Sequence, residues 1–193
     1  GEVTVEEAWQ LISPNSFSGS WSALTVTADR RFTLLSDAAM VTRFTLARDG
    51  RVGAVAMHEL PLRRGVERRK ELMDSESLTV DPASGHAWVG FEYDTRIGRY
   101  AADLTRFEGE TRPPAMRRWS RSRGPEAMTH LPDGRLLVLA ELPPPGAEHR
   151  NALILPHDPV ARPAVPPVAT DYDRAGRGPV TDAVTLPDGR ILI

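Results

Sequence analysis

Residues 126–141 read EAMTHLPDGRLLVLAE, and this stretch decides the fold. Two apolar runs flank a Pro-Asp-Gly turn at 132–134, which predicts a β-hairpin. The second run, 136–140, is apolar at every position. This pattern is typical of a strand that is covered on both faces. We therefore expect the hairpin to lie between stacked sheets.

Related stretches recur along the chain. They begin near residues 22, 76, 126 and 182 and read SALTVTADRRFTLLSD, ESLTVDPASGHAWVGFE, EAMTHLPDGRLLVLAE and DAVTLPDGRILI. The first apolar residue after each opening position is found at 24, 78, 128 and 184, at spacings of 54, 50 and 56 residues. A period near 50 residues predicts an all-β fold, a β-propeller with four-stranded antiparallel blades.

Further strand-like segments lie between the hairpins. Residues 41–47 and 52–57 follow the first hairpin, 97–102 and 116–120 follow the second, and 152–155 follow the third. At this spacing the 193 residues supply about three and a half blades of a ring that we expect to have about six. We therefore expect 1–193 to be a single propeller domain that is incomplete at its C-terminal end.

The composition excludes several classes of protein. The chain is 40% hydrophobic and 26% charged, and none of its apolar runs approaches the roughly 18 residues of a membrane span. Its formal net charge of −2, without a basic patch interleaved with aromatic residues, argues against a nucleic-acid partner. It contains no Cys, which excludes disulfides and thiolate sites.

One run of charge stands out, RRGVERRKE at 63–71. We interpret it as a solvated loop between blades, with a polyanion-binding loop as the alternative.

Acidic residues recur at matched positions of the hairpins. One set opens the first strands and the other follows the second strands. The six residues are Glu76, Glu126 and Asp182 in the first set and Asp37, Glu92 and Glu141 in the second. Because hairpin strands are antiparallel, both positions lie at the same end of a blade. We therefore expect an acidic rim around one mouth of the propeller, and strand parity directs Glu76 to the same side as Leu78 and Val80.

Converging carboxylates raise one another's pKa unless cations compensate. A Ca²⁺ ion is one solution, because it takes oxygen ligands, and we predict Glu76, Glu126 and Asp182 as metal ligands. The predicted catalytic carboxylates are Glu76, Glu126 and Asp37, while Glu92 and Glu141 complete the rim.

Arginine is the other solution. Arg96 and Arg123 lie next to rim acids in the sequence and could reach the rim and contact an anion. A structural role, in which the acids fix hydrogen bonds between blades, stays open.

Three stretches carry a family resemblance. The segments SGSWSALTVTADRRFTLLSD, DSESLTVDPASGHAWVGFE and RGPEAMTHLPDGRLLVLAE resemble successive motifs of the bacterial phytase-like family, called "esterase-like activity of phytase". The resemblance runs from about residue 18 to residue 193. It implies a β-propeller, usually exported to the periplasm or secreted, whose repeated Glu and Asp residues carry a phosphoester or ester hydrolase activity. The acids that match are Asp37, Glu76, Glu92, Glu126, Glu141 and, more weakly, Asp182.

Three functions fit these observations. The first is a metal-assisted hydrolase of a small-molecule phosphoester or ester, and the second is a non-catalytic extracytoplasmic binding or scaffold propeller. A gluconolactonase-type lactonase is the third, but the chain has only Asn15 and Asn151 as asparagine ligands, both outside the hairpins. The sequence lacks the Gly-x-Ser-x-Gly and His-Glu-x-x-His patterns of other hydrolases.

Overall fold

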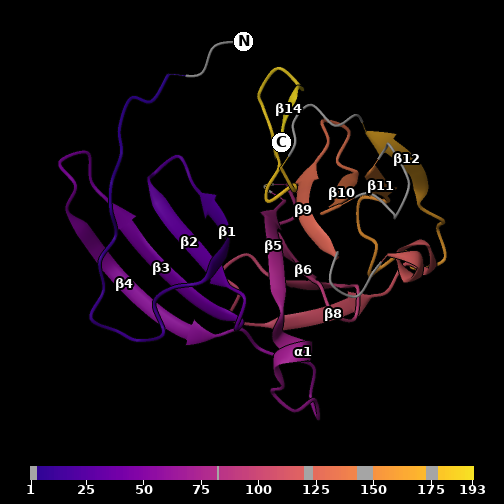
Figure 1. Ribbon diagram of the computed structural model, residues 1–193, viewed down its shortest axis with the longest axis horizontal. Coiled ribbons are helices and arrows are strands. Elements are labelled where there is room, and N and C mark those ends of the chain that lie inside the picture. The colour runs from indigo at the N-terminus through magenta and orange to yellow at the C-terminus, as the bar shows by residue number, and fades with distance from the viewer. Residues whose placement is uncertain (1–3, 82, 120–123, 143–149, 173–177) are drawn as a thin grey trace.

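The computed structural model describes residues 4–81, 83–119, 124–142, 150–172 and 178–193. This part of the chain forms three four-stranded antiparallel sheets and a final two-stranded sheet (Figure 1). Its helical segments are short: α1 (Lys70–Met73) and the 3₁₀ turn η1 (Pro114–Arg118). Within the described ranges, neither segment has the length and apolar character needed to cross a membrane.

Each sheet is a simple up-and-down succession of neighbouring strands. The first contains β1 (Trp21–Val26), β2 (Arg31–Ser36), β3 (Met40–Leu46) and β4 (Val52–Glu59). The second contains β5 (Ser75–Val80), β6 (His86–Phe91), β7 (Arg96–Ala101) and β8 (Phe107–Thr111). The third contains β9 (Pro125–His130), β10 (Leu136–Ala140), β11 (Arg150–Leu155) and β12 (Val168–Tyr172). The last contains β13 (Val184–Thr185) and β14 (Ile191–Leu192).

The sheets follow one another around an arc, with the first strand of each sheet next to the first strand of its neighbour. β5 contacts both β1 and β9, and β9 contacts β13. This is the blade arrangement of a β-propeller, as the repeat predicts. The four predicted hairpins are all present.

The apolar core lies between successive blades. β10 shows this most clearly, because its side chains alternate between two clusters. Leu136 and Val138 pack with Trp88 of the second blade, whereas Leu137 and Leu139 pack with the segment leading into the fourth repeat. The continuous apolar run of this strand therefore serves two interfaces, as predicted.

One predicted strand is wrong. The fourth strand of the second blade is β8, at Phe107–Thr111, and not residues 116–120. Pro113 and Pro114 precede the predicted strand and lack the N–H groups that a ladder needs. Pro114 instead begins η1, since proline suits the first turn of a helix. The outer strand β12 of the third blade is absent from the predicted strands.

Candidate functional site

Glu76 and Glu126 each occupy a β-bulge at the start of an inner strand. The residues on either side of Glu76 pair with Phe91 and Gly90, which are adjacent in β6, so Glu76 itself has no partner. The pairing of β9 with β10 skips Glu126 in the same way, and that of β1 skips Ser22. A bulge re-aims the side chain of the extra residue. The repeat therefore delivers two acids and one serine through the same local distortion.

The bulge makes strand parity the wrong guide to Glu76. Parity assumes an uninterrupted ladder, and the bulge interrupts it between Ser75 and Ser77. Leu78 is buried in the core between the first two blades, whereas Glu76 is half-buried and faces other carboxylates.

Two groups of three carboxylates lie within metal-binding distance. Oxygen atoms of Asp74, Glu76 and Glu92 lie within 4.8 Å of one another, and so do those of Glu92, Glu126 and Glu141. Glu92 belongs to both groups. The second and third blades therefore form one continuous acidic site, which we call the acidic mouth.

Backbone contacts bring these acids together. Glu92 follows β6, and its N–H donates to the carbonyl of Asp74, at the end of α1, at 2.9 Å. Gly124, just before β9, lies against Glu92 so closely that a Cβ would stand 2.5 Å from the Cα of Glu92. The absence of a side chain at Gly124 lets the third blade approach Glu92.

Three carboxylates of the acidic mouth, Glu76, Glu92 and Glu126, hold protons more strongly than usual. Burial, followed by repulsion from Glu76, Glu141 and Glu92, raises the pKa of Glu126 to about 9. Burial, followed by repulsion from Asp74 and Glu92, raises the pKa of Glu76 to about 7. Burial also raises the pKa of Glu92, although a hydrogen bond with Glu126 opposes this effect. Glu126 and Glu92 therefore share a hydrogen bond in which a proton is held to a higher pH than on a free glutamate.

Asp37 borders this site. It follows β2 in the first blade, its N–H donates to the carbonyl of Ser20 at 3.1 Å, and its charge contributes to the raised pKa of Glu76. It belongs to neither of the two ligand groups formed by the described residues.

Asp182 lies apart from both ligand groups within the described ranges. Its carboxylate accepts a hydrogen bond from the N–H of Ala183 at 2.8 Å, and burial raises its pKa. The fourth repeat forms strands of only two residues, so Asp182 precedes β13 rather than occupying a bulge within it. The structure therefore does not place Asp182 with Glu76 and Glu126.

Of the two arginines predicted to contact an anion, Arg96 lies among the described residues and Arg123 does not. Arg96 is buried, and its guanidinium pairs with Asp94 at 2.5 Å and Glu110 at 3.5 Å. It lies 3.7 Å from the ring centre of Phe91 and donates to the carbonyl of Leu72. The side chain is thus engaged within the second blade. Arg123 lies outside the described residues.

Asp74 is the site residue that sequence reasoning missed. It lies two residues before Glu76, and the matching positions in the first and third repeats hold Ser20 and Gly124. A comparison of repeats could not reveal an acid that only one of these repeats carries. The local Asp-Ser-Glu spacing at 74–76 was the available signal.

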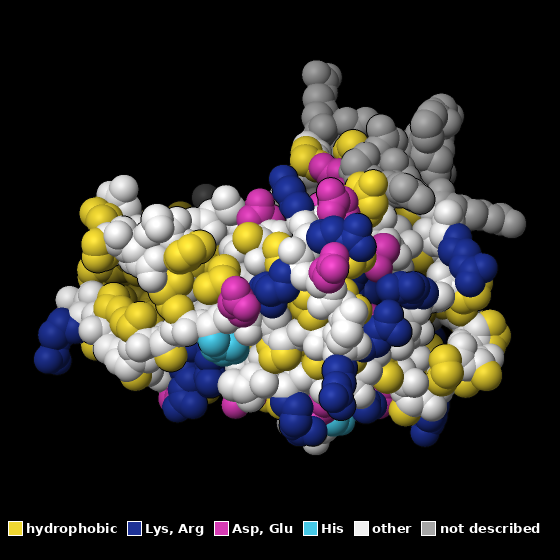
Figure 2. Space-filling view, turned by 90° about the horizontal axis from the view of Figure 1, so that it is seen from below, with side chains coloured by type: hydrophobic (Ala, Val, Ile, Leu, Met, Phe, Trp, Pro, Cys, Tyr) yellow, Lys and Arg dark blue, Asp and Glu magenta, His cyan; other side chains and the backbone are white. Residues whose placement is uncertain are grey.

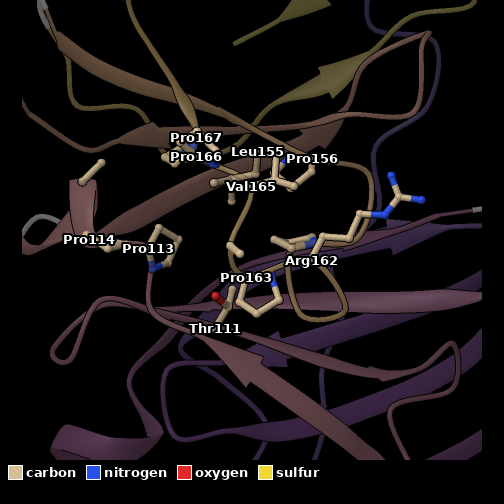
Figure 3. A pocket seen from close by; sticks show the side chains of 13 residues that line it. Thr111, Pro113, Pro114, Leu155, Pro156, Arg162, Pro163, Val165, Pro166 and Pro167 are labelled. Carbon is tan, nitrogen blue, oxygen red and sulfur yellow. The ribbon is translucent and has the colours of Figure 1, made fainter.

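Apolar hollows lie elsewhere on the molecule. A cavity of about 240 Å³ lies between η1 and the 156–167 segment, lined mostly by prolines, with Arg162 at its edge (Figure 3). A second, of about 490 Å³, lies between the N-terminal segment and the first blade. Neither is lined by an acid of the mouth. The acids and these hollows are separate features.

A scan of known families decides the relationship of this chain. The family described as "Phytase-like: esterase-like activity of phytase" matches residues 16–193. The chain belongs to the phytase-like family. The extent of the match agrees closely with the stretch over which the motifs resemble that family.

This phytase-like chain also resembles solved propellers. A Bacteroides uniformis protein, provisionally described as a 6-phosphogluconolactonase, is 12% identical with a TM-score of 0.52, covering 92% of this chain and 48% of that one. The Dos1 propeller is 8% identical with a TM-score of 0.50, covering 91% and 42%. At these identities the likeness shows the fold alone. The chain spans about half the length of these structures, and a search of curated proteins finds no match.

Proposed function

We propose that the acidic mouth is the site of a metal-dependent hydrolase that acts on phosphoesters or esters of small molecules. One observation carries the proposal: two ligand groups share Glu92 on one continuous surface. Two of their members are held by β-bulges, which are often found next to active sites. Membership of the phytase-like family supports the same reaction class.

The donor set fits a hard divalent cation such as Ca²⁺. Every candidate ligand is a carboxylate oxygen, and Ca²⁺ takes six to eight oxygen ligands at flexible geometry. Burial and, after it, repulsion from neighbouring carboxylates raise the pKa of Glu76, Glu92 and Glu126, and a bound cation would oppose both effects. Asp74, Glu76 and Glu92 would hold one cation, and Glu141 would join Glu92 and Glu126 in holding another.

The chain's own residues supply the proton chemistry. When bound, a divalent cation supplies Lewis-acid polarisation of the ester oxygen. Without a cation Glu126 keeps its proton at neutral pH, and it would lose that proton on joining Glu92 and Glu141 around a metal, because a carboxylate binds a metal in its deprotonated form. Glu76 lies outside that second ligand group, and its pKa of about 7 lets it gain and lose a proton near neutrality. With a cation in the second group alone, Glu76 is therefore suited to act as general base.

A purely structural role for the acids has less support. Serine hydroxyls already tie neighbouring blades together: Ser22 donates to the carbonyl of Ser75 at 2.5 Å, and Ser75 donates to that of Ser36 at 2.7 Å. Ser77 donates to the carbonyl of Pro125. The carboxylates instead face one another, an arrangement that destabilises the metal-free fold.

The test uses the intact protein. Melting temperature and hydrolysis of p-nitrophenyl phosphate and p-nitrophenyl acetate are measured with Ca²⁺ and with chelator. We expect Ca²⁺ to raise both, and Glu92→Gln to abolish both responses, because Glu92 belongs to both groups. Asp171→Asn, on exposed β12, is the control.

If Ca²⁺ changes neither the melting temperature nor the hydrolysis rate, the proposed metal site is wrong. Stabilisation by Ca²⁺ without turnover of either ester would favour a binding propeller.

Export of the protein to the periplasm or its secretion stays a prediction.

A further inference from the structure

A buried arginine links α1 to the second blade. Arg96 begins β7, its side chain is 6% exposed, and its guanidinium donates to the carbonyl of Leu72 in α1. We propose that Arg96 is a positioning residue, which acts through α1 to hold Asp74 in the first ligand group of the acidic mouth before a cation binds. This inference rests on the proposed metal-dependent function and names a residue that prepares its site.

α1 has little support of its own. It is a single turn, Lys70–Met73, with no buried residue, and its N-cap, Arg69, makes no side-chain capping hydrogen bond. In Figure 1 α1 extends beyond the lower end of β5, and Figure 2 views the molecule from this side, where charged side chains of both signs lie at the surface. Met73, which is half-buried, packs against the core of the first two blades. A helix this short needs further contacts to stay in place.

The contact with Arg96 meets a specific need of α1. The last carbonyl groups of a helix have no partner within the helix. Leu72 carries one of these groups, and Arg96 supplies the missing donor. Asp74, the C-cap of α1, comes two residues after Leu72. A fixed Leu72 therefore restricts the positions that Asp74 can take.

The second blade also holds Asp74 through the backbone. The carbonyl of Asp74 accepts a hydrogen bond from the N–H of Glu92 at 2.9 Å, and its own N–H donates to the carbonyl of Lys70 at 3.0 Å. Glu92 follows β6 and Arg96 begins β7, so one turn of the second blade supplies both contacts to α1 and its cap. With these contacts in place, carboxylate oxygens of Asp74, Glu76 and Glu92 lie within 4.8 Å of one another.

The side chain of Arg96 is itself held on several sides. Its guanidinium donates to Asp94 at 2.5 Å, lies 3.5 Å from Glu110 and stands over the ring of Phe91 at 3.7 Å. These groups fix the donor that Leu72 receives. Asp94 and Glu110 also compensate the positive charge of Arg96. We therefore expect Arg96 to act on the acidic mouth through position rather than through charge.

The sequence places Arg96 and Asp74 in the same repeat. Arg96 is the fourth residue after the acid that follows the second hairpin. The same position holds Val41 in the first repeat and Pro145 in the third, and neither of these repeats has an acid at the position of Asp74. Among these three repeats, the arginine therefore occurs only where there is an acid for it to position.

The test compares two arginines of β7 that lie in ion pairs. Arg96→Met removes the donor to Leu72. Arg99→Met is the matched control, because the contacts of Arg99 are with Asp158 at 2.5 Å and Glu108 at 3.4 Å, away from α1. Both variants lose one partner of a largely buried ion pair, so both should be less stable than the unaltered protein.

Hydrogen exchange of the intact, metal-free protein measures how firmly Asp74 is held. We expect R96M to speed exchange of the N–H groups of Asp74 and Glu92 at least about tenfold, the equivalent of 1.4 kcal/mol. R99M should change it less than about twofold, because groups that exchange through local opening do not respond to the stability of the whole fold. Circular dichroism checks folding. R96K and R99K replace a methionine variant that unfolds, and a lysine cannot hold Leu72, Asp94 and Glu110 at once, so the same contrast is expected.

A Ca²⁺ titration gives the functional readout. If Arg96 acts through Asp74, R96M and D74N weaken the same binding event. The double variant D74N/R96M should then bind Ca²⁺ no more weakly than D74N alone, whereas a general structural role would make the two losses add. R99M should leave Ca²⁺ binding within about twofold of the unaltered protein, because additive, distant sites do not couple.

Three results would overturn the proposal: unchanged exchange in R96M, equal acceleration in R96M and R99M, or additive losses in D74N/R96M. Failure of the hydrolase proposal looks different. If the unaltered protein does not bind Ca²⁺, the metal site is wrong, while the exchange experiment in chelator still decides whether Arg96 holds Asp74 in place.

Discussion

At Glu126, burial and repulsion from neighbouring carboxylates both favour the protonated form of the side chain. Its pKa rises from 4.5 to about 9, and that of Glu76 rises from 4.5 to about 7. At pH values between the pKa of a glutamate in the unfolded chain and its pKa in the folded protein, the folded protein binds more protons than the unfolded chain. Raising the pH through this range therefore favours unfolding. A bound cation would favour the deprotonated, folded protein instead.

This linkage predicts the pH dependence of stability. In chelator, the melting temperature should fall as the pH rises from about 5 to about 9. Glu126→Gln should flatten the upper part of this decline, because the neutral amide does not titrate. Thermal unfolding followed by circular dichroism across this range gives the measurement. A melting temperature that rises with pH, or a decline that Glu126→Gln leaves unchanged, contradicts the assigned electrostatics.

Gly124 gives a second test at the scale of one residue. A Cβ there would stand 2.5 Å from the backbone of Glu92, so Gly124→Ala should cost about 1–3 kcal/mol of stability and weaken Ca²⁺ binding. Gly178→Ala, whose Cβ would meet no atom within 4 Å, is the control. Urea unfolding of the two variants provides the comparison. Equal stability would mean that the close approach is not required.

At the scale of elements, the inner hairpins separate structural from functional side chains. Ser77→Ala removes a buried hydroxyl and leaves the carbonyl of Pro125 without its donor. We expect a loss of about 1–3 kcal/mol. Glu76→Gln, next to it, removes repulsion and should not destabilise the metal-free protein. If urea unfolding shows that Glu76→Gln is the more harmful change, the acid is structural.

The hairpins and the end at which their acids gather could be predicted from the sequence, because both follow from repeat spacing and antiparallel pairing. The bulges could not, since a bulge depends on pairing between strands and Glu76 has an ordinary strand neighbourhood. The strand expected at 116–120 failed because the two prolines before it start a 3₁₀ turn. Asp74 was missed because its place in the site depends on α1 and not on the repeat.

At the scale of the whole molecule, the same apolar position of the repeat is buried in two repeats and exposed in the other two. Leu78 and Met128, in the second and third blades, are 3% and 1% exposed. The matching Leu24 and Val184, in the first and fourth repeats, are 45% and 49% exposed. We propose that further blades, beyond these 193 residues, cover both positions and complete the ring. The predicted total of six blades stays a prediction.

Cysteine labelling tests this closure. The 193 residues contain no Cys, so Leu24→Cys and Val184→Cys each introduce a thiol at a known position. In the intact protein we expect both to react slowly with a maleimide, as slowly as Leu78→Cys. Val5→Cys, at an exposed position, should react fast. Fast labelling at Leu24→Cys and Val184→Cys would show that the arc stays open.

The most direct test of the central claim is a calorimetric titration of the intact protein with Ca²⁺. The acidic mouth predicts binding that tightens as the pH rises, because the protons on Glu76 and Glu126 must leave. It also predicts that Glu92→Gln loses this binding, while Asp171→Asn keeps it. If the unaltered protein does not bind Ca²⁺, or if Glu92→Gln binds it equally well, the acidic mouth is not a metal centre.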